Sequence, residues 1–103
     1  MYKLSFFVPK EHKEKVKEAL FSIGAGKYKK YDKCSWEVLG SGQFRPLQGA
    51  DPFLGSVGAV ERVDEYKVEM ICEDKVIKKA VTTLKEAHPY EEVAYEVIKL
   101  EEF

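Results

Sequence analysis

Residues 75 to 100, KVIKKAVTTLKEAHPYEEVAYEVIKL, change from a helical pattern to a strand pattern around a single proline. The apolar positions of the first half recur with the period of an amphipathic helix. They are Val76, Ile77, Ala80, Val81, Leu84 and Ala87. Pro89 disfavours helical geometry at His88, so we predict a helix over Lys75 to Ala87. Val93 to Leu100 is apolar on both faces, which is typical of a strand covered on both sides.

Two further strands are predicted before this helix, over Tyr31 to Leu39 and over Ala59 to Cys72. The second is long and would span about 46 Å at a rise of roughly 3.3 Å per residue. Its apolar positions also change phase, because Val63 is odd-numbered whereas Tyr66, Val68, Met70 and Cys72 are even-numbered. We therefore predict a β-bulge near Asp64.

The chain opens with a strand followed by a helix. Tyr2 to Val8 alternates apolar and polar residues, as a half-buried strand does. From Glu11 to Ile23 the apolar residues recur at helical spacing, and Gly24 supplies the residue type that commonly closes a helix. The order β-α-β-β-α-β predicts an α+β, ferredoxin-like fold, a four-stranded antiparallel sheet with both helices on one face. Its other face would expose Phe7 and Ile71, so we expect a homo-oligomer.

Composition limits the class of protein. A chain of 103 residues has room for one domain, over residues 1 to 103. Its 17 basic and 18 acidic residues nearly cancel, so we expect neither nucleic acid nor a membrane surface as a partner. No basic stretch followed by a long apolar run opens this sequence, no segment approaches the length of a membrane span, and the two cysteines have no CxxC spacing, so we expect a cytoplasmic protein.

The first candidate site is the segment from Gly40 to Gly58, predicted as a long loop, which holds five of the seven glycines. Gly40 and Gly42 would let the backbone approach a ligand, beside Phe44, and Arg45 offers a planar fork for a carboxylate or phosphate. The alternative is a structured crossover whose phenylalanines fill the core or contact a neighbouring subunit. The segment lacks both a P-loop ending and a dinucleotide fingerprint.

The second candidate site is HPYEE, residues 88 to 92. His88 and Glu91 are suitable ligands for a divalent metal ion, the one cofactor that the residues suggest. The alternative is that His88 caps the preceding helix while the glutamates are solvated. Cys34, in YDKCSW, is a third candidate, as a metal ligand or a nucleophile, although a buried structural thiol is the commoner role for such a residue.

Three stretches together resemble a known family: YDKCSW, GSGQFRPLQGADPFLGSVG and AHPYEEVAYEVIKLE. They are similar to the insertion domain of bacterial Ngg-one-interacting-factor-three-like proteins, the YqfO group, and the resemblance covers essentially the whole chain. That domain normally lies between two halves of a dinuclear-metal domain, which this sequence lacks, so the family's metal chemistry does not carry over. The domain itself resembles the PII and CutA proteins, and CutA shares the HPYE element. The resemblance implies a PII/CutA-like fold and a trimer.

Two classes of function follow. The first is a non-catalytic oligomeric module that senses or binds a small ligand or divalent metal, or regulates a partner protein. The second is a small metal-dependent hydrolase that uses Cys34, His88 and Glu91.

Overall fold

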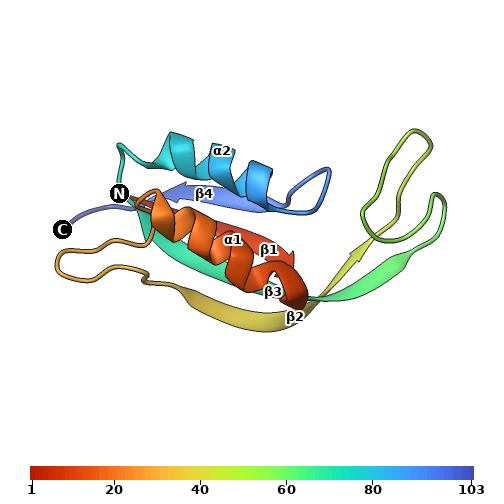
Figure 1. The fold of residues 1–103 in the computed structure, drawn as a ribbon, viewed down its shortest axis with the longest axis horizontal. Helices are drawn as coiled ribbons and strands as arrows, with labels where there is room; N and C mark the ends of the chain where they lie inside the picture. The colour runs from red at the N-terminus through yellow and green to blue at the C-terminus, as the bar shows by residue number, and fades with distance from the viewer.

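A computed structural model describes all 103 residues and contains four strands and two helices. They are β1 (Tyr2–Pro9), α1 (Lys10–Ser22), β2 (Trp36–Phe44), β3 (Glu61–Cys72), α2 (Ile77–Ala87) and β4 (Tyr95–Lys99). All four strands form one antiparallel sheet in the order β2-β3-β1-β4. Both helices lie on the same face of this sheet (Figure 1). The predicted ferredoxin-like α+β fold is therefore confirmed.

The core lies between the helices and the sheet face that they cover. It is one cluster of eleven buried residues: Leu4, Phe6, Val8, Val16, Leu20, Ala25, Val68, Met70, Cys72, Ala80 and Leu84. Alternate residues of β1 and β3 supply the sheet side of the cluster, as the period of a strand requires. Neither helix is long and apolar enough to cross a membrane.

Strands β2 and β3 extend beyond the core at one end of the sheet. β1 ends at Pro9, which pairs with Glu65, so the first four residues of β3 pair with β2 alone. The β2–β3 hairpin therefore projects beyond the helices, and the connection between its strands folds at the far end (Figure 1). The molecule measures 47 × 25 × 24 Å as a result.

Two sequence predictions about this hairpin are wrong. The predicted loop does not begin at Gly40, because β2 continues to Phe44, and Gly40 and Gly42 are paired with Glu65 and Val63. β2 is an edge strand, where glycine is tolerated because β3 supplies the hydrogen-bonded ladder on one side. The strand also begins at Trp36 instead of Tyr31, since the preceding residues form a turn in which Lys29 and Lys33 have positive φ.

The bulge predicted near Asp64 is also absent. Every residue of β2 is opposite one residue of β3, without interruption from Trp36 and Glu69 to Phe44 and Glu61. The apolar phase changes in β3 because its first residues lie beyond the helices, where no core selects the even-numbered positions. Val63 lies on the face away from the helices.

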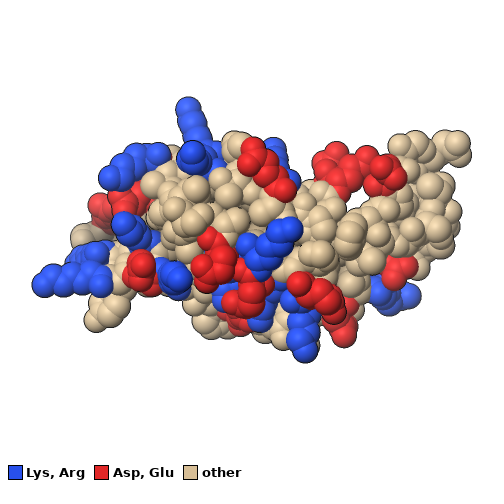
Figure 2. Space-filling view, viewed as in Figure 1, with Lys and Arg blue, Asp and Glu red and all other residues tan.

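That outer face carries several exposed apolar side chains. Trp36 is 60% exposed, Val38 45% and Ile98 51%. Phe7 and Ile71 lie on this face, as predicted, but they are half-buried instead of exposed. Charged groups are dispersed over the helical face seen in Figure 2, whereas the projecting end is mostly uncharged.

Candidate functional site

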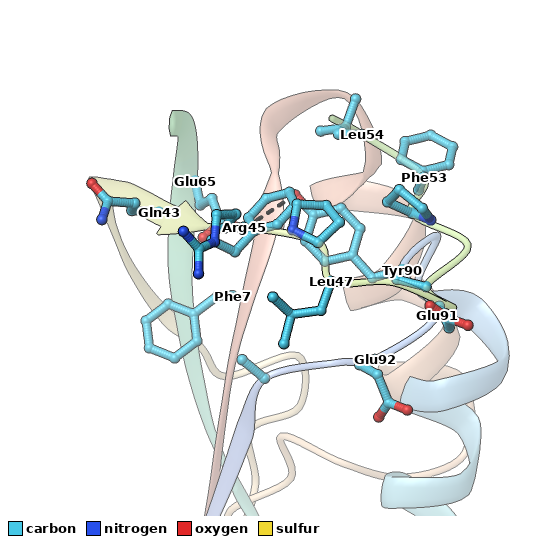
Figure 3. A pocket seen from close by; sticks show the side chains of 15 residues that line it. Phe7, Gln43, Arg45, Leu47, Phe53, Leu54, Glu65, Tyr90, Glu91 and Glu92 are labelled. Carbon is cyan, nitrogen blue, oxygen red and sulfur yellow. Dashed lines mark hydrogen bonds between the residues drawn. The ribbon is translucent and has the colours of Figure 1, made fainter. Parts of the chain in front are cut away.

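A pocket of about 400 Å³ lies at the projecting end of the molecule. The β2–β3 connection forms one wall and the segment that follows α2 forms the other (Figure 3). Fifteen residues line it: Phe7, Gln43, Phe44, Arg45, Pro46, Leu47, Ala50, Pro52, Phe53, Leu54, Glu65, Tyr90, Glu91, Glu92 and Ala94. The lining is largely apolar with a few charged groups, which is typical of a site for a small organic molecule.

Tyr90 holds the two walls together. Its ring centroid lies 6.3 Å from that of Phe44 and 6.2 Å from that of Phe53. Phe53 in turn meets the ring of His12 on α1 edge-on, with the centroids 5.4 Å apart. The backbone N–H of Asp51 donates to Glu91 Oε2 over 3.2 Å. These contacts fold the connection back onto the body of the domain.

Phe53 is nevertheless 51% exposed. The alternative prediction, in which the phenylalanines of this segment fill the core, therefore fails within one chain. The role in contacting a neighbouring subunit stays a prediction.

His88 positions Tyr90 by linking its backbone to strand β1. Its side chain is buried, and its Nε2 lies 2.6 Å from the carbonyl oxygen of Phe7. The backbone N–H of Tyr90 donates to Nδ1 over 3.1 Å, so Nδ1 is the acceptor and Nε2 carries the proton. Burial lowers the pKa of His88 despite the bond to Phe7. The imidazole is therefore a neutral link between β1 and the pocket wall.

This geometry bears on both predictions for His88. The residue is at the C-cap of α2, as the capping alternative requires, but its imidazole bonds β1 and Tyr90 instead of the helix carbonyls. Both ring nitrogens are already occupied, so the predicted role in metal binding draws no support from its contacts.

The other predicted metal ligands do not join it. Glu91 bonds Asp51 in the pocket wall. The backbone N–H of Cys34 donates to the carbonyl oxygen of Gly26, and the backbone N–H of Gly26 donates to that of Ile71, at the opposite end of the sheet. Ile71 pairs with Lys3, four residues from Phe7, which is about 13 Å along a strand. No group of three or more His, Cys, Asp and Glu side chains is arranged to hold a metal ion.

The predicted ligand-binding residues are closer together. Arg45 and Phe44 line the pocket, and the Arg45 side chain is exposed and makes no salt bridge within the chain. Gly40 and Gly42 line a second, smaller hollow of about 290 Å³ that shares Phe7, Gln43, Glu65 and Ala94 with the first. The two hollows thus lie side by side on the outer face of the sheet.

Glu65 belongs to both hollows and was not predicted as a site residue. Tyr90 donates its hydroxyl proton to Glu65 Oε2 over 3.2 Å, and this bond is drawn in Figure 3. Burial raises the pKa of the Glu65 carboxyl, and it also raises the pKa of Tyr90 beside that carboxylate. The one sequence signal for this position is indirect, since it requires knowing that the strand opposite carries Gly40 and Gly42.

The chain has curated relatives that are much longer than itself. It is 42% identical over 100 residues to the GTP cyclohydrolase 1 type 2 homolog of Bacillus subtilis. The aligned residues are 97% of this chain and 27% of that protein. The protein of the same name from Mycobacterium leprae is 44% identical over 94 residues, 91% of this chain and 24% of its own length. The chain therefore spans about a quarter of these relatives. No family model matches it.

Solved structures agree with this relationship. A Bacillus cereus protein related to NIF3 superimposes with a TM-score of 0.84 at 38% identity, over 98% of this chain and 26% of that one. The periplasmic divalent cation tolerance protein CutA of Archaeoglobus fulgidus gives a TM-score of 0.71 at 15% identity, over 100% of this chain and 87% of that one. The second likeness shows the fold alone. The chain therefore has a PII/CutA-like fold and is homologous to a segment, about a quarter in length, of the YqfO-like, NIF3-related proteins.

Proposed function

We propose that this domain is a non-catalytic, oligomeric binding module of the cytoplasm that holds a small organic molecule in its pocket. By binding the molecule there, the domain would sense it or regulate a partner protein. The pocket of about 400 Å³ carries the proposal, since it falls within the range of roughly 300 to 1,000 Å³ that is usual for small-molecule sites. The residues proposed to bind are Phe44 and Arg45 in the larger hollow, and Gly40 and Gly42 in the smaller one.

Arg45 is the residue proposed to hold an acidic group of the ligand. Its guanidinium has no carboxylate partner within the chain, and the rest of the connection up to Val60 contains one other charged residue, Asp51. A guanidinium can bind a carboxylate or phosphate with two parallel hydrogen bonds. An apolar molecule with one acidic end matches this wall of the pocket.

Self-association, with a trimer favoured, is the second part of the proposal. Trp36, Val38 and Ile98 expose apolar surface on the sheet face that the helices leave uncovered. Large exposed apolar patches commonly mark association surfaces. Packing this face between subunits would also bring the hollows of the outer face close to a neighbouring chain.

Titration of the ¹⁵N-labelled protein tests ligand binding. Guanosine triphosphate is a suitable first probe because it appears in the name of the longer relatives. Benzoate provides a small acid that is not a nucleotide. We expect shifts at Phe44, Leu47 and Tyr90, and a loss of affinity in Arg45→Ala. Arg62→Ala is the matched control, since it removes the chain's other arginine, which is exposed and outside the pocket.

The free energy of unfolding should remain within about 0.5 kcal/mol of the wild type in both arginine variants, as for most surface changes. Pocket resonances that stay unmoved by both probes at millimolar concentration would contradict the proposed binding of acidic ligands. Equal losses of affinity in both variants would show that Arg45 has no specific role.

A further inference from the structure

The Glu65 carboxylate lies where the two hollows meet. It projects from the outer face of β3, directly opposite Gly40 of the edge strand. Its Oε1 lies over Gly42, so that a Cβ atom at residue 42 would overlap the carboxylate. The absence of side chains at these two positions of β2 therefore leaves the space that Glu65 occupies.

This carboxylate is only partly satisfied by the protein. Oε2 accepts the Tyr90 hydroxyl, whereas Oε1 accepts no hydrogen bond from the chain. No lysine or arginine forms a salt bridge with it, since the nearby Lys67 pairs instead with Glu69 at 3.2 Å. A half-buried carboxylate without a cation beside it retains the capacity to bind a donor group.

The surroundings favour a positively charged donor. Three carboxylates line the larger hollow, those of Glu65, Glu91 and Glu92, against the single guanidinium of Arg45. The aromatic rings of Phe7, Phe44 and Tyr90 line the same space. Aromatic faces attract cations, and a carboxylate can accept two parallel N–H bonds from a planar group.

We propose that Glu65 is the specificity-determining residue of the pocket and binds a planar, amidine-like group of the ligand, in which two N–H donors flank one carbon. This inference rests on the proposed function. Arg45 would hold the acidic end of the ligand, and Glu65 would hold the opposite end. The aromatic rings would pack against the body of the ligand, and Tyr90 would hold the carboxylate in place.

Three probes of nearly equal shape test the inference: benzamidine, benzamide and benzoate. Each is titrated into the ¹⁵N-labelled protein. We expect benzamidine to bind at least about ten-fold more tightly than benzamide, the factor that corresponds to about 1.4 kcal/mol for one charge-assisted contact. Shifts should centre on Glu65 and Tyr90.

Glu65→Gln should abolish the preference for benzamidine over benzamide. Glu92→Gln is the matched control, because it makes the same chemical change at an exposed residue of the same pocket that forms no hydrogen bond or salt bridge. The preference should survive in this control. Equal losses in both variants would show that the general negative charge of the pocket, and not Glu65, selects the probe.

A further variant keeps the carboxylate and moves it. Gly42→Ala forces the Glu65 side chain aside, because the added Cβ would overlap the carboxylate. The variant should therefore reduce the preference for benzamidine over benzamide. It tests the position of the carboxylate without removing its charge, and circular dichroism verifies that the variant is folded.

The inference is overturned if benzamide binds as well as benzamidine, or if benzamidine leaves the pocket resonances unmoved. In either case, binding of guanosine triphosphate or benzoate that depends on Arg45 would leave the proposed function standing. Failure of the acidic probes together with binding of benzamidine would instead support the role of Glu65 and refute that of Arg45.

Discussion

The buried imidazole of His88 makes the stability of this domain depend on pH near neutrality. The pKa of His88 is lowered by burial in the folded state, whereas the unfolded chain has the ordinary value of about 6.5. The unfolded state therefore binds a proton more readily, and folding stability is present above about pH 6.5 and is lost as the pH falls below it. Protonation would also break the bond from the Tyr90 N–H to Nδ1.

The size of the effect follows from linkage. Each pH unit between the unfolded and folded pKa values costs about 1.4 kcal/mol, so a fall from pH 7.5 to 5.5 should remove at most about 1.4 kcal/mol. A domain of this size should then lose at most about 11 °C in melting temperature. Glu37, Glu69 and Asp74 have lowered pKa values, so their contributions are lost only below about pH 4.5, outside this range.

Urea unfolding of the wild type and of His88→Gln, at pH 7.5 and 5.5, measures this difference. The variant should lose about 1 to 3 kcal/mol at pH 7.5, because two buried hydrogen bonds are disturbed. It should lose no further stability as the pH falls to 5.5, because the raised pKa of Glu65 acts in the opposite direction. His12→Gln is the matched control, since His12 is less buried and packs against Phe53. Its charge also helps to lower the pKa of His88, but burial is the larger cause, so this variant should retain most of the wild-type slope. Equal slopes in His88→Gln and the wild type would refute the reasoning.

Three further predictions concern assembly, metal and thiols. Light scattering at micromolar concentration should give a mass well above 11.8 kDa, and a monomer throughout that range would remove the support for a subunit interface. Calorimetry with zinc at pH 7.5 should show little or no heat that depends on His88, since both ring nitrogens are bonded, and tight binding abolished by His88→Ala would contradict this. An excess of a thiol reagent should modify Cys34 first, because Cys72 is buried and its pKa is raised to about 11, and the reverse order of modification would show that the edge of the core opens readily.

Local sequence patterns determined the elements of the fold. The helical period ends at Ala87 in both the prediction and the structure, because Pro89 acts on the residue immediately before it. β1 and α1 are also found within one or two residues of their predicted bounds. Such signals depend on neighbours along the chain, so a single sequence contains them in full. The order of the elements then limits the topology to a split βαβ arrangement.

The site was predicted only in part, because its residues meet across the sheet. Arg45 was singled out in the sequence because a guanidinium is a planar fork for an acidic group, and Phe44 lies next to it; both residues line the pocket. Glu65 resembles any charged residue of a strand until the register places it against Gly40. The sequence also did not predict that β2 continues to Phe44, because its glycines have low strand propensity. The hydrogen bonds to β3 across the sheet outweigh this low propensity.

His88 shows most clearly which features the sequence determines and which depend on the tertiary structure. The sequence by itself determined that this residue ends α2 and precedes a turn. Only the tertiary structure decided that its two nitrogens join β1 to Tyr90, because both acceptor and donor are backbone groups, which the identities of side chains do not reveal. Backbone groups are the same at every residue, so the partner of a buried imidazole depends on how the chain packs and not on which residues it contains.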